Sequence, residues 1–441
     1  MKRFDLIVIG TGLAGLTAAR TAVEMGAKVL IAGRGMGALT LFGNTIDLLG
    51  EIPPETEMAE GIPRWIAAHP EHPYARTGMG GIENALADFR GLFPPPYSFA
   101  AEGKGNSLLP TGAGTMRPTY LIPVTMAAGA AMTPAETLIV GLRGFKDFQG
   151  DTVSLHLKCR GVTLSLPRYG LEGLTALALA RLMDEVSFRE RLGEAIRQQM
   201  AGERFIGLPA ILGLRDPAAV LNTLEAVTGA RVFEIPMLPP SIPGTRIFRR
   251  FREELIAKGA TFLMGHPVSG ANVKDGRCEG ITVQNPPLAT EYRADRYILA
   301  TGRFLGGGLW AEMERIVEPL FHLPVFQPGE RGKWFGERFF DPEAHPIHRA
   351  GIVTDADLRP VDETGRVVLE NVRAAGSILA HHQAIEEKSR EGIDIATGFL
   401  AAKRALPKGY LIHETGEGKR GQSLQAVAGK RQGHPPAFQV E

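Results

Sequence analysis

The chain has 441 residues, of which 44% are hydrophobic, 22% charged and 7% aromatic, with a formal net charge of +1. This length exceeds what one compact core holds, so two domains are expected, and the near-neutral charge gives no general attraction to nucleic acid or anionic lipid. Cys159 and Cys278 are the only cysteines, too few for a disulfide framework or a common iron–sulfur cluster. The first residues lack a signal-peptide pattern, and proline and glycine interrupt the longest uncharged stretch, residues 118–135, so no membrane span is predicted.

The first 32 residues have the pattern of a β-α-β unit. Residues 4–9 are a short apolar run suited to a strand buried on both faces, and residues 16–25 are a helical stretch that ends at Gly26. Residues 28–32 form a second apolar run. The spacing of these elements is typical of a nucleotide-binding unit.

Further strands and helices follow along the chain, and those of the middle part alternate as in a second α/β domain. Helices are predicted at residues 82–93, 171–183, 186–200, 247–258 and 393–405, and strands at residues 138–142, 205–208, 259–264 and within 267–299.

A glycine loop joins the first strand to the first helix. Gly10, Gly12 and Gly15 fit the pattern G-x-G-x-x-G, directly after a strand and before a helix as the motif requires. Such glycines permit a tight turn, close approach of the backbone to a phosphate, and close packing of helix on strand. The helix N-terminus adds unpaired N–H groups and a positive dipole end for the anion.

One expected contact is missing from this unit. A carboxylate near the end of the second strand usually bonds the ribose hydroxyls of a dinucleotide, but this place reads Gly33-Arg34-Gly35. Adenosine binding in the usual manner is therefore not indicated. Arg34 and Gly35 are predicted to lie at the cofactor, where Arg34 could face the phosphate of a mononucleotide or of a phosphorylated dinucleotide; a solvated loop arginine has the same pattern.

Two later segments favour a flavin over a nicotinamide cofactor. Residues 297–302 are an apolar strand that ends in Ala-Thr-Gly, and residues 371–377 include Ala-Ala-Gly-Ser. Both resemble segments that two-dinucleotide-fold flavoproteins bring to the flavin. A helix opening at Gly392 would point a positive N-terminus at the reduced ring. The flavin contacts predicted in these segments are Thr301, Gly302, Gly376 and Ser377.

These patterns together predict an α/β protein with a Rossmann-like, two-dinucleotide-binding-domain flavoprotein fold and an inserted α/β domain. Residues 1–120 and 243–414 are expected to form a discontinuous flavin-binding domain, and residues 121–242 an inserted cap or partner domain. Residues 415–441 are polar and glycine-rich and are predicted to be a disordered tail.

Two residue pairs are candidates for contact with the reacting groups. Asn44 and Thr45, in a loop of small residues after the second strand, could face the isoalloxazine ring or form a simple turn. His381 and His382 closely follow the Ala-Ala-Gly-Ser segment. They could accept the proton of an alcohol during its oxidation, or they could be structural.

A third candidate is a stripe of positive charge. Arg246, Arg249 and Arg250 recur at i, i+3 and i+4 near the start of a predicted helix, where they could bind a substrate phosphate. A solvated or partner-facing surface has the same pattern. No metal site is predicted.

Longer strings resemble one family, the B subunits of the anaerobic glycerol-3-phosphate dehydrogenase. The likeness extends over most of the chain and is loose at about residues 145–235. It rests on residues 34–39, 43–49, 238–246 with the motif Leu-Pro-Pro-Ser, 304–309 and 353–360.

This resemblance implies an FMN-linked subunit that works beside an FAD-bearing catalytic partner, the A subunit of the same complex. The complex would oxidise sn-glycerol 3-phosphate to dihydroxyacetone phosphate and pass electrons to a membrane-bound iron–sulfur subunit. The chain would then be cytoplasmic, peripheral to the inner membrane through its partner subunits. FMN is the expected cofactor because the ribose carboxylate is missing, with FAD as the alternative.

Two other functions fit the same segments. One is a stand-alone FAD-dependent oxidoreductase of the fumarate-reductase or ketosteroid-dehydrogenase kind, which the Ala-Thr-Gly and Ala-Ala-Gly segments also resemble. The other is a non-catalytic flavin-binding scaffold that supports a partner subunit.

Overall fold

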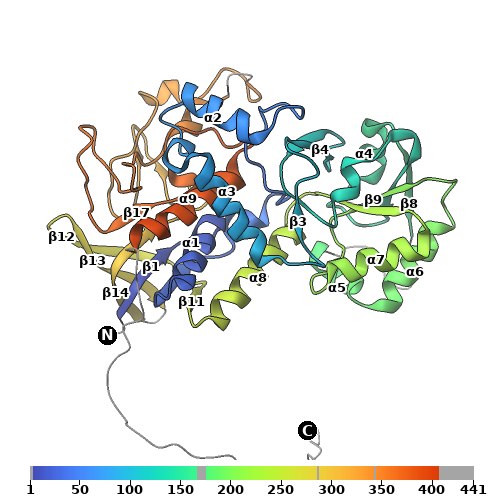
Figure 1. The fold of residues 1–441 in the computed structure, drawn as a ribbon, viewed down its shortest axis with the longest axis horizontal. Helices are drawn as coiled ribbons and strands as arrows, with labels where there is room; N and C mark the ends of the chain where they lie inside the picture. The colour runs from blue at the N-terminus through green and yellow to red at the C-terminus, as the bar shows by residue number, and fades with distance from the viewer. Residues whose placement is uncertain (1–2, 166–174, 286–287, 342–343, 407–441) are drawn as a thin grey trace, which may run out of the picture. The chain divides into compact units, whose positions relative to one another are not determined.

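The computed structural model describes residues 3–165, 175–285, 288–341 and 344–406. Its larger sheet has a parallel core in the order β11-β2-β1-β14-β17, and β13 and β12 extend it in antiparallel fashion beside the first part of β14 (Figure 1). The strands are β1 Arg3–Ile9, β2 Val29–Gly33, β11 Thr261–Met264, β12 Val268–Lys274, β13 Arg277–Asn285, β14 Leu288–Leu299 and β17 Val372–Ala374.

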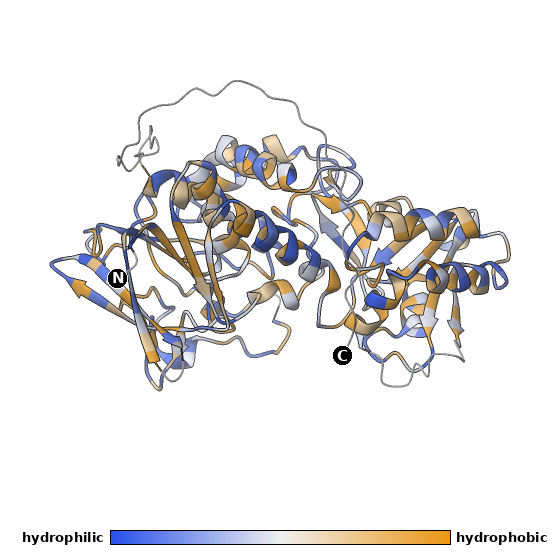
Figure 2. Cartoon of the chain, turned by 90° about the horizontal axis from the view of Figure 1, so that it is seen from below, coloured by the Kyte–Doolittle hydropathy of each residue, from blue (hydrophilic) through white to orange (hydrophobic). Residues whose placement is uncertain are grey.

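Strands β1, β2 and β17 and the end of β14 are largely buried on both faces, whereas the edge strand β11 is half-buried. In β1, Leu6 and Val8 pack into one hydrophobic cluster, whereas Ile7 and Ile9 pack into another on the opposite side. The continuous apolar run that predicted a doubly buried strand is explained by this alternation. Hydrophobic colouring accordingly follows the strands of the sheet (Figure 2).

Helices from both ends of the chain cover one face of the sheet. The first and last helices, α1 and α9, pack side by side, and α3 and α8 lie against them (Figure 1). The N-terminal and C-terminal segments therefore build one domain core. The helices of this part are α1 Leu13–Glu24, α2 Met58–Ala68, α3 Tyr74–Leu92, α8 Ile242–Ala257 and α9 Arg390–Ala405.

The middle of the chain forms a second, fully parallel sheet in the order β10-β9-β7-β8 with its own hydrophobic cluster. This agrees with the α/β character predicted there, while the boundaries at residues 121 and 242 stay a prediction. Its elements are β7 Thr137–Leu142, α4 Gly150–Leu157, β8 Arg160–Leu164, α5 Ala176–Met183, α6 Val186–Arg197, β9 Phe205–Pro209, α7 Pro217–Thr228 and β10 Arg231–Ile235.

Short elements complete the chain. Small antiparallel pairs join β3 Phe99–Ala100 to β6 Ile122–Pro123, β4 Ser107–Pro110 to β5 Met116–Thr119, and β15 Trp310–Ala311 to β16 Ile316–Val317. The start of the helix predicted at 171–183, and the predicted tail, lie outside the described residues. Among the described residues, no helix combines the length and apolar character that a membrane span needs.

Candidate functional site

The glycine loop lies where β1, the end of β14 and α1 meet. Gly10 has a φ of +119°, and a Cβ there would overlap the carbonyl oxygen of Ala300. A Cβ on Gly15 would overlap the carbonyl oxygen of Gly10. These two glycines thus allow backbone contact among three elements, which agrees with the predicted packing roles.

Gly12 has a different environment. A Cβ on Gly12 would meet no heavy atom within 4 Å, so no protein group requires a glycine there. Gly12 is also the N-cap of α1, which has no side-chain cap and no acidic residue in its first turn. A helix N-terminus that is uncapped and open fits a bound phosphate.

The end of β2 has no room for the carboxylate that such units usually carry. A Cβ on Gly33 would overlap the hydroxyl of Thr11, whose Oγ1 donates a 2.5 Å hydrogen bond to the carbonyl of Gly35. Arg34 is exposed, and its Nη1 lies 3.3 Å from the position of a Cβ on Gly307. Arg34 therefore reaches toward the loop that follows β14.

The two late segments predicted to bind the flavin lie side by side. Gly302 and Gly376 have φ angles of +71° and +79°, and the Oγ of Ser377 lies 3.5 Å from a Cβ built on Gly302. A Cβ on Gly376 would be 2.6 Å from the Cβ of Ala14 in α1. The structure therefore brings the segments at residues 10–15, 301–302 and 376–377 together.

The start of α9 carries buried carboxyl groups beside these segments. Asp394 accepts a 3.1 Å hydrogen bond from the backbone N–H of Ser377, and burial raises its pKa to about 6. Burial also raises the pKa of Glu391 to about 7, and the nearby charge of Asp47 raises it although the Arg390 guanidinium opposes the shift. Arg390 is paired with Glu391 and lies over the ring of Phe42. Protonation of these groups near neutral pH therefore changes the charge at the start of α9.

The loop with Asn44 and Thr45 is tied to the protein. Asn44 Nδ2 is bonded to the carbonyls of Leu39 and Phe42 and lies 3.0 Å from Ser241 Oγ, so this residue fixes a turn. Its Oδ1 is buried and has no partner among the described residues. Thr45 donates a 3.0 Å hydrogen bond to Asp47. Their contact with an isoalloxazine ring stays a prediction.

The three arginines of the predicted phosphate stripe have separate partners. Arg246 is buried and makes bonds of 2.7 and 2.8 Å to the Glu234 carboxylate; although burial disfavours its charge, this carboxylate keeps the pKa of Arg246 above its ordinary value. Arg249 lies 3.8 Å from Glu253. Arg250 donates to the Leu92 carbonyl and pairs with Glu254. Substrate binding by these arginines stays a prediction.

His382 lies in a cluster that local sequence patterns did not indicate. Its side chain is only 1% exposed, and its ring centroid is 6.1 Å from that of His72. Arg303, directly after the Ala-Thr-Gly segment, donates hydrogen bonds to the carbonyls of Leu379 and His382. In the sequence, only the position of Arg303 after this motif could have indicated its role, because its hydrogen-bond partners are backbone atoms far along the chain.

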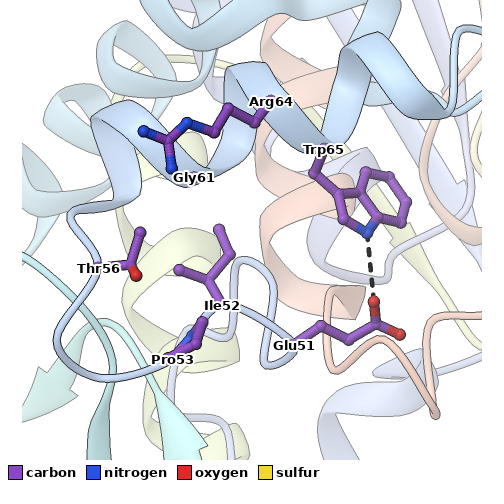
Figure 3. A pocket seen from close by; sticks show the side chains of 7 residues that line it. All are labelled: Glu51, Ile52, Pro53, Thr56, Gly61, Arg64 and Trp65. Atoms are coloured by element: carbon purple, nitrogen blue, oxygen red, sulfur yellow. Dashed lines mark hydrogen bonds between the residues drawn. The ribbon is translucent and has the colours of Figure 1, made fainter.

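An open surface pocket of about 350 Å³ lies beside this cluster. No residue of the glycine loop lines this pocket. Its lining includes Trp65, whose indole N–H donates to Glu51 across the pocket edge (Figure 3). The ring of Trp65 also packs edge-on against His72 at 4.5 Å. The remaining lining residues are Ile52, Pro53, Thr56, Gly61 and Arg64.

The residues at the glycine loop fit a flavin. An open helix N-terminus can take its phosphate, and the hydroxyl oxygen of Thr301 and Oδ1 of Asn44 are buried polar atoms without partners among the described residues. Among the residues that the structure describes, no group of three or more His, Cys, Asp or Glu side chains could hold a metal ion.

Substitutions of Gly12 and Gly15 are predicted to have different effects, one on cofactor binding and the other on folding. Gly12→Ala should leave the melting temperature of the flavin-free protein nearly unchanged and weaken flavin binding at least about tenfold, because the methyl group takes the space of the phosphate. Gly15→Ala should destabilise folding by about 2 kcal/mol through overlap with the Gly10 carbonyl. Thermal unfolding and flavin titration of the apoprotein measure both. Unchanged flavin affinity in Gly12→Ala would contradict the assignment.

The buried carboxyl group of Glu391 is predicted to make stability depend on pH. Because its pKa is raised to about 7 in the folded protein, its favourable contribution is complete below the unfolded pKa near 4.3 and is lost as the pH rises through 7. Glu391→Gln should therefore resemble the wild type at pH 4 and be more stable at pH 8, by on the order of 2 kcal/mol. Urea unfolding at several pH values tests this, with exposed Glu363→Gln as control. If the free energies of unfolding of the wild type and of Glu391→Gln differed by the same amount at every pH, the predicted effect of Glu391 would be excluded.

Known proteins resemble this chain over most of its length. A family model described as FAD binding domain matches residues 5–389. The probable B subunit of an anaerobic glycerol-3-phosphate dehydrogenase from Halobacterium salinarum is 32% identical over 422 residues, which cover 91% of this chain and 97% of that protein. The B subunit of the anaerobic glycerol-3-phosphate dehydrogenase from Vibrio cholerae is 29% identical over 432 residues, covering 92% and 97%.

One solved structure resembles this chain in its fold, with a much lower sequence identity than the relatives above. The 3-ketosteroid delta1-dehydrogenase from Sterolibacterium denitrificans superposes with a TM-score of 0.43 at 10% identity, covering 92% of this chain and 99% of that one; a likeness this loose carries no argument. The family match confirms the flavoprotein fold predicted from the glycine segments. The chain belongs to the FAD-binding-domain family and, within it, to the family formed by the B subunits of anaerobic glycerol-3-phosphate dehydrogenases.

Proposed function

We propose that this chain is a flavin-bearing subunit of a complex that oxidises sn-glycerol 3-phosphate to dihydroxyacetone phosphate. An FAD-bearing subunit is its catalytic partner, and electrons pass on to a membrane-bound iron–sulfur subunit, which keeps the chain peripheral to the inner membrane. The observation that carries this proposal is the match, over nearly their whole length, to relatives named as B subunits of such a dehydrogenase.

The cysteines support the need for an electron-accepting partner. Burial raises the pKa of Cys159 and of Cys278 to about 11, so both are thiols at neutral pH, whereas cluster ligands are thiolates. With two cysteines in the whole chain, electrons that reach its flavin must leave to another redox group.

We infer that the flavin is FMN. The Thr11 hydroxyl occupies the place of any side chain at Gly33, so β2 offers no carboxylate to an adenosine ribose. The charge of Arg34 and the open start of α1 instead suit a terminal phosphate. The family model is one of FAD binding, and FAD is the alternative.

The protein's own part in the chemistry is to bind the flavin and to set the electrostatic charge near the flavin ring. A bound flavin supplies the capacity to accept two reducing equivalents and pass them on. The amide groups at the start of α1 would hold its phosphate, and Thr301 and Ser377 would bond its polar chain. The start of α9 would stabilise negative charge on the ring, while ionisation of Glu391 would oppose it.

One observation favours a second candidate, in which this chain oxidises the alcohol by itself. His382 lies four residues after the Gly376–Ile378 turn, and burial, followed by the charge of Arg303, holds its pKa well below the ordinary value. A buried neutral imidazole can accept a proton from an alcohol. His381 and His382 therefore stay candidates for catalysis in this chain.

Assay of the chain with and without its partner tests the proposal. Glycerol-3-phosphate-dependent reduction of an artificial acceptor should be absent or slight with the flavin-loaded chain alone and should rise at least about tenfold when the FAD-bearing partner is added. A complex reconstituted with the Gly12→Ala chain, at a flavin concentration too low to load this variant, should lose electron transfer to the iron–sulfur subunit. Full activity of the isolated chain would instead establish the second candidate.

A further inference from the structure

Apolar side chains that water reaches gather in one segment of the chain, residues 305–340. Among the residues that the structure describes, every exposed Phe or Trp side chain lies in this segment. Single exposed apolar residues are ordinary on a protein surface, whereas a large patch of them marks a binding surface. The six most exposed of these side chains, from 52% for Trp310 to 88% for Phe340, are called the aromatic surface here: Leu305, Trp310, Met313, Phe335, Phe339 and Phe340.

The three phenylalanines of the aromatic surface lie around one histidine. The ring of His345 packs edge-on against the ring of Phe335, with 5.8 Å between the centroids. His345 also accepts a 3.0 Å hydrogen bond from the backbone N–H of Gly336, and its Nε2 lies 3.0 Å from the carbonyl oxygen of Phe339. The rings of Phe339 and Phe340 pack edge-on at 4.8 Å. The three exposed rings therefore belong to one packed loop.

The hairpin of β15 and β16 carries another part of the aromatic surface. It starts at Trp310 and has Met313 in its turn. Arg331 donates a 2.7 Å hydrogen bond to the carbonyl of Glu312 in the same turn, and its guanidinium lies 5.2 Å from the ring centroid of Trp334. Arg331 thus joins the hairpin to the loop of the three phenylalanines, which starts directly after Trp334.

The aromatic surface begins beside the predicted flavin contacts. A Cβ on Gly308 would overlap the carbonyl oxygen of Gly302, so the start of the segment packs directly on the Ala-Thr-Gly motif. A Cβ built on Gly307 would lie 3.3 Å from Nη1 of Arg34 and 4.0 Å from Nε1 of Trp310. Trp310 and the arginine of the β2 turn therefore flank the same glycine, and a protein bound to the aromatic surface would lie next to the cofactor site.

The size of the aromatic surface fits a partner that stays bound. At about 200 Å² for a whole aromatic side chain, its four aromatic members expose on the order of 600 Å². The largest apolar patch of an ordinary monomer measures about 300–600 Å², and one partner contributes about 800 Å² to a standard protein interface. With Leu305 and Met313 added, the surface is large enough for one side of such an interface. Its apolar character is typical of subunits that associate permanently.

The charges around the aromatic surface disfavour an anionic membrane as its occupant. Residues 305–341 contain six acidic and four basic residues, a net charge of −2. Two of the basic residues, Arg315 and Lys333, pair with Glu312 and Glu330 of the same segment. Binding to anionic lipid is favoured by an excess of lysine and arginine. The charge therefore favours a soluble protein partner over a lipid surface and over a subunit embedded in it.

We propose that the aromatic surface is the docking face of this chain for the FAD-bearing subunit of the dehydrogenase complex. That subunit covers the three phenylalanine rings and Trp310, and its bound position brings its cofactor close to the cofactor site of this chain. The identity of the partner rests on the proposed function, whereas the surface rests on the exposure and packing of its side chains.

Calorimetric titration of the flavin-loaded full-length chain with the purified FAD-bearing subunit tests the docking face. The Phe339→Ser/Phe340→Ser double variant should bind at least about tenfold more weakly than the wild type, because aromatic anchors contribute much of the binding free energy of an interface. Met313→Ser should weaken binding by a smaller factor. Leu155→Ser is the matched control, since Leu155 is 74% exposed on α4 of the second sheet, and it should bind as the wild type does.

Two further measurements separate docking from folding and from chemistry. The double variant should keep the wild-type melting temperature and flavin content, because both side chains are exposed. Its glycerol-3-phosphate-dependent reduction of an artificial acceptor should be slow at limiting FAD-bearing subunit and should return to the wild-type rate at saturation. A rate that stays low at saturation would contradict a role in docking alone.

The possible results distinguish the docking face from the proposed function. Wild-type affinity in both the double variant and Met313→Ser would overturn the docking face and leave the proposed function standing. A wild-type chain that does not bind the FAD-bearing subunit would refute the proposed function and the partner named here. If the double variant kept that affinity but lost self-association in sedimentation, or lost binding to anionic phospholipid vesicles, the surface would belong to a second copy or to a membrane, and the proposal would be overturned.

Discussion

Backbone contact at the glycine loop is the constraint on which the rest of the structure depends. The Gly10 carbonyl touches the start of α1 at Gly15, and its Cα touches the end of β14 at Ala300, where a side chain would overlap in either case. In the same way, a Cβ on Gly398 of α9 would overlap the carbonyl oxygen of Ala14 in α1. Close approach at these points lets α9 and β14 reach the first helix, so that residues near 10, 300 and 376 surround one site.

The same close packing explains the missing carboxylate at β2. Thr11 bonds Gly35 and fills the space beside Gly33, which excludes an acid on steric grounds and leaves Arg34 as the charged group of this turn. Our proposal of FMN follows from this geometry, because a site without a ribose carboxylate and with an arginine suits a terminal phosphate.

Much of the fold was predictable, since apolar runs and glycine positions are local signals. The first strand, the G-x-G-x-x-G turn and the last helix lie close to their predicted places. Helix starts were less accurate. The helix predicted from residue 247 begins at Ile242, because Ser241 Oγ caps it by accepting from Gly244 N–H at 3.0 Å. Gly78, with a φ of +63° near the start of α3, obscured the beginning of that helix in the sequence.

The site was predictable only where its residues form motifs. Arg246 has the spacing of a phosphate ligand, yet its partner Glu234 comes from a strand of the second sheet, which helical periodicity cannot reveal. Arg303 and His72 were not predicted, because the carbonyls and rings that they meet come from distant segments. Tertiary contacts of this kind leave no local pattern in the sequence.

We infer that this chain itself holds one flavin with a terminal phosphate. Acid extraction of the chromophore from the purified full-length chain, followed by chromatography and quantification per chain, tests this claim most directly. FMN at about one molecule per chain is the expected result. Extraction of FAD would contradict the role given to the β2 turn, and a colourless chain that takes up no flavin would contradict the claim as a whole.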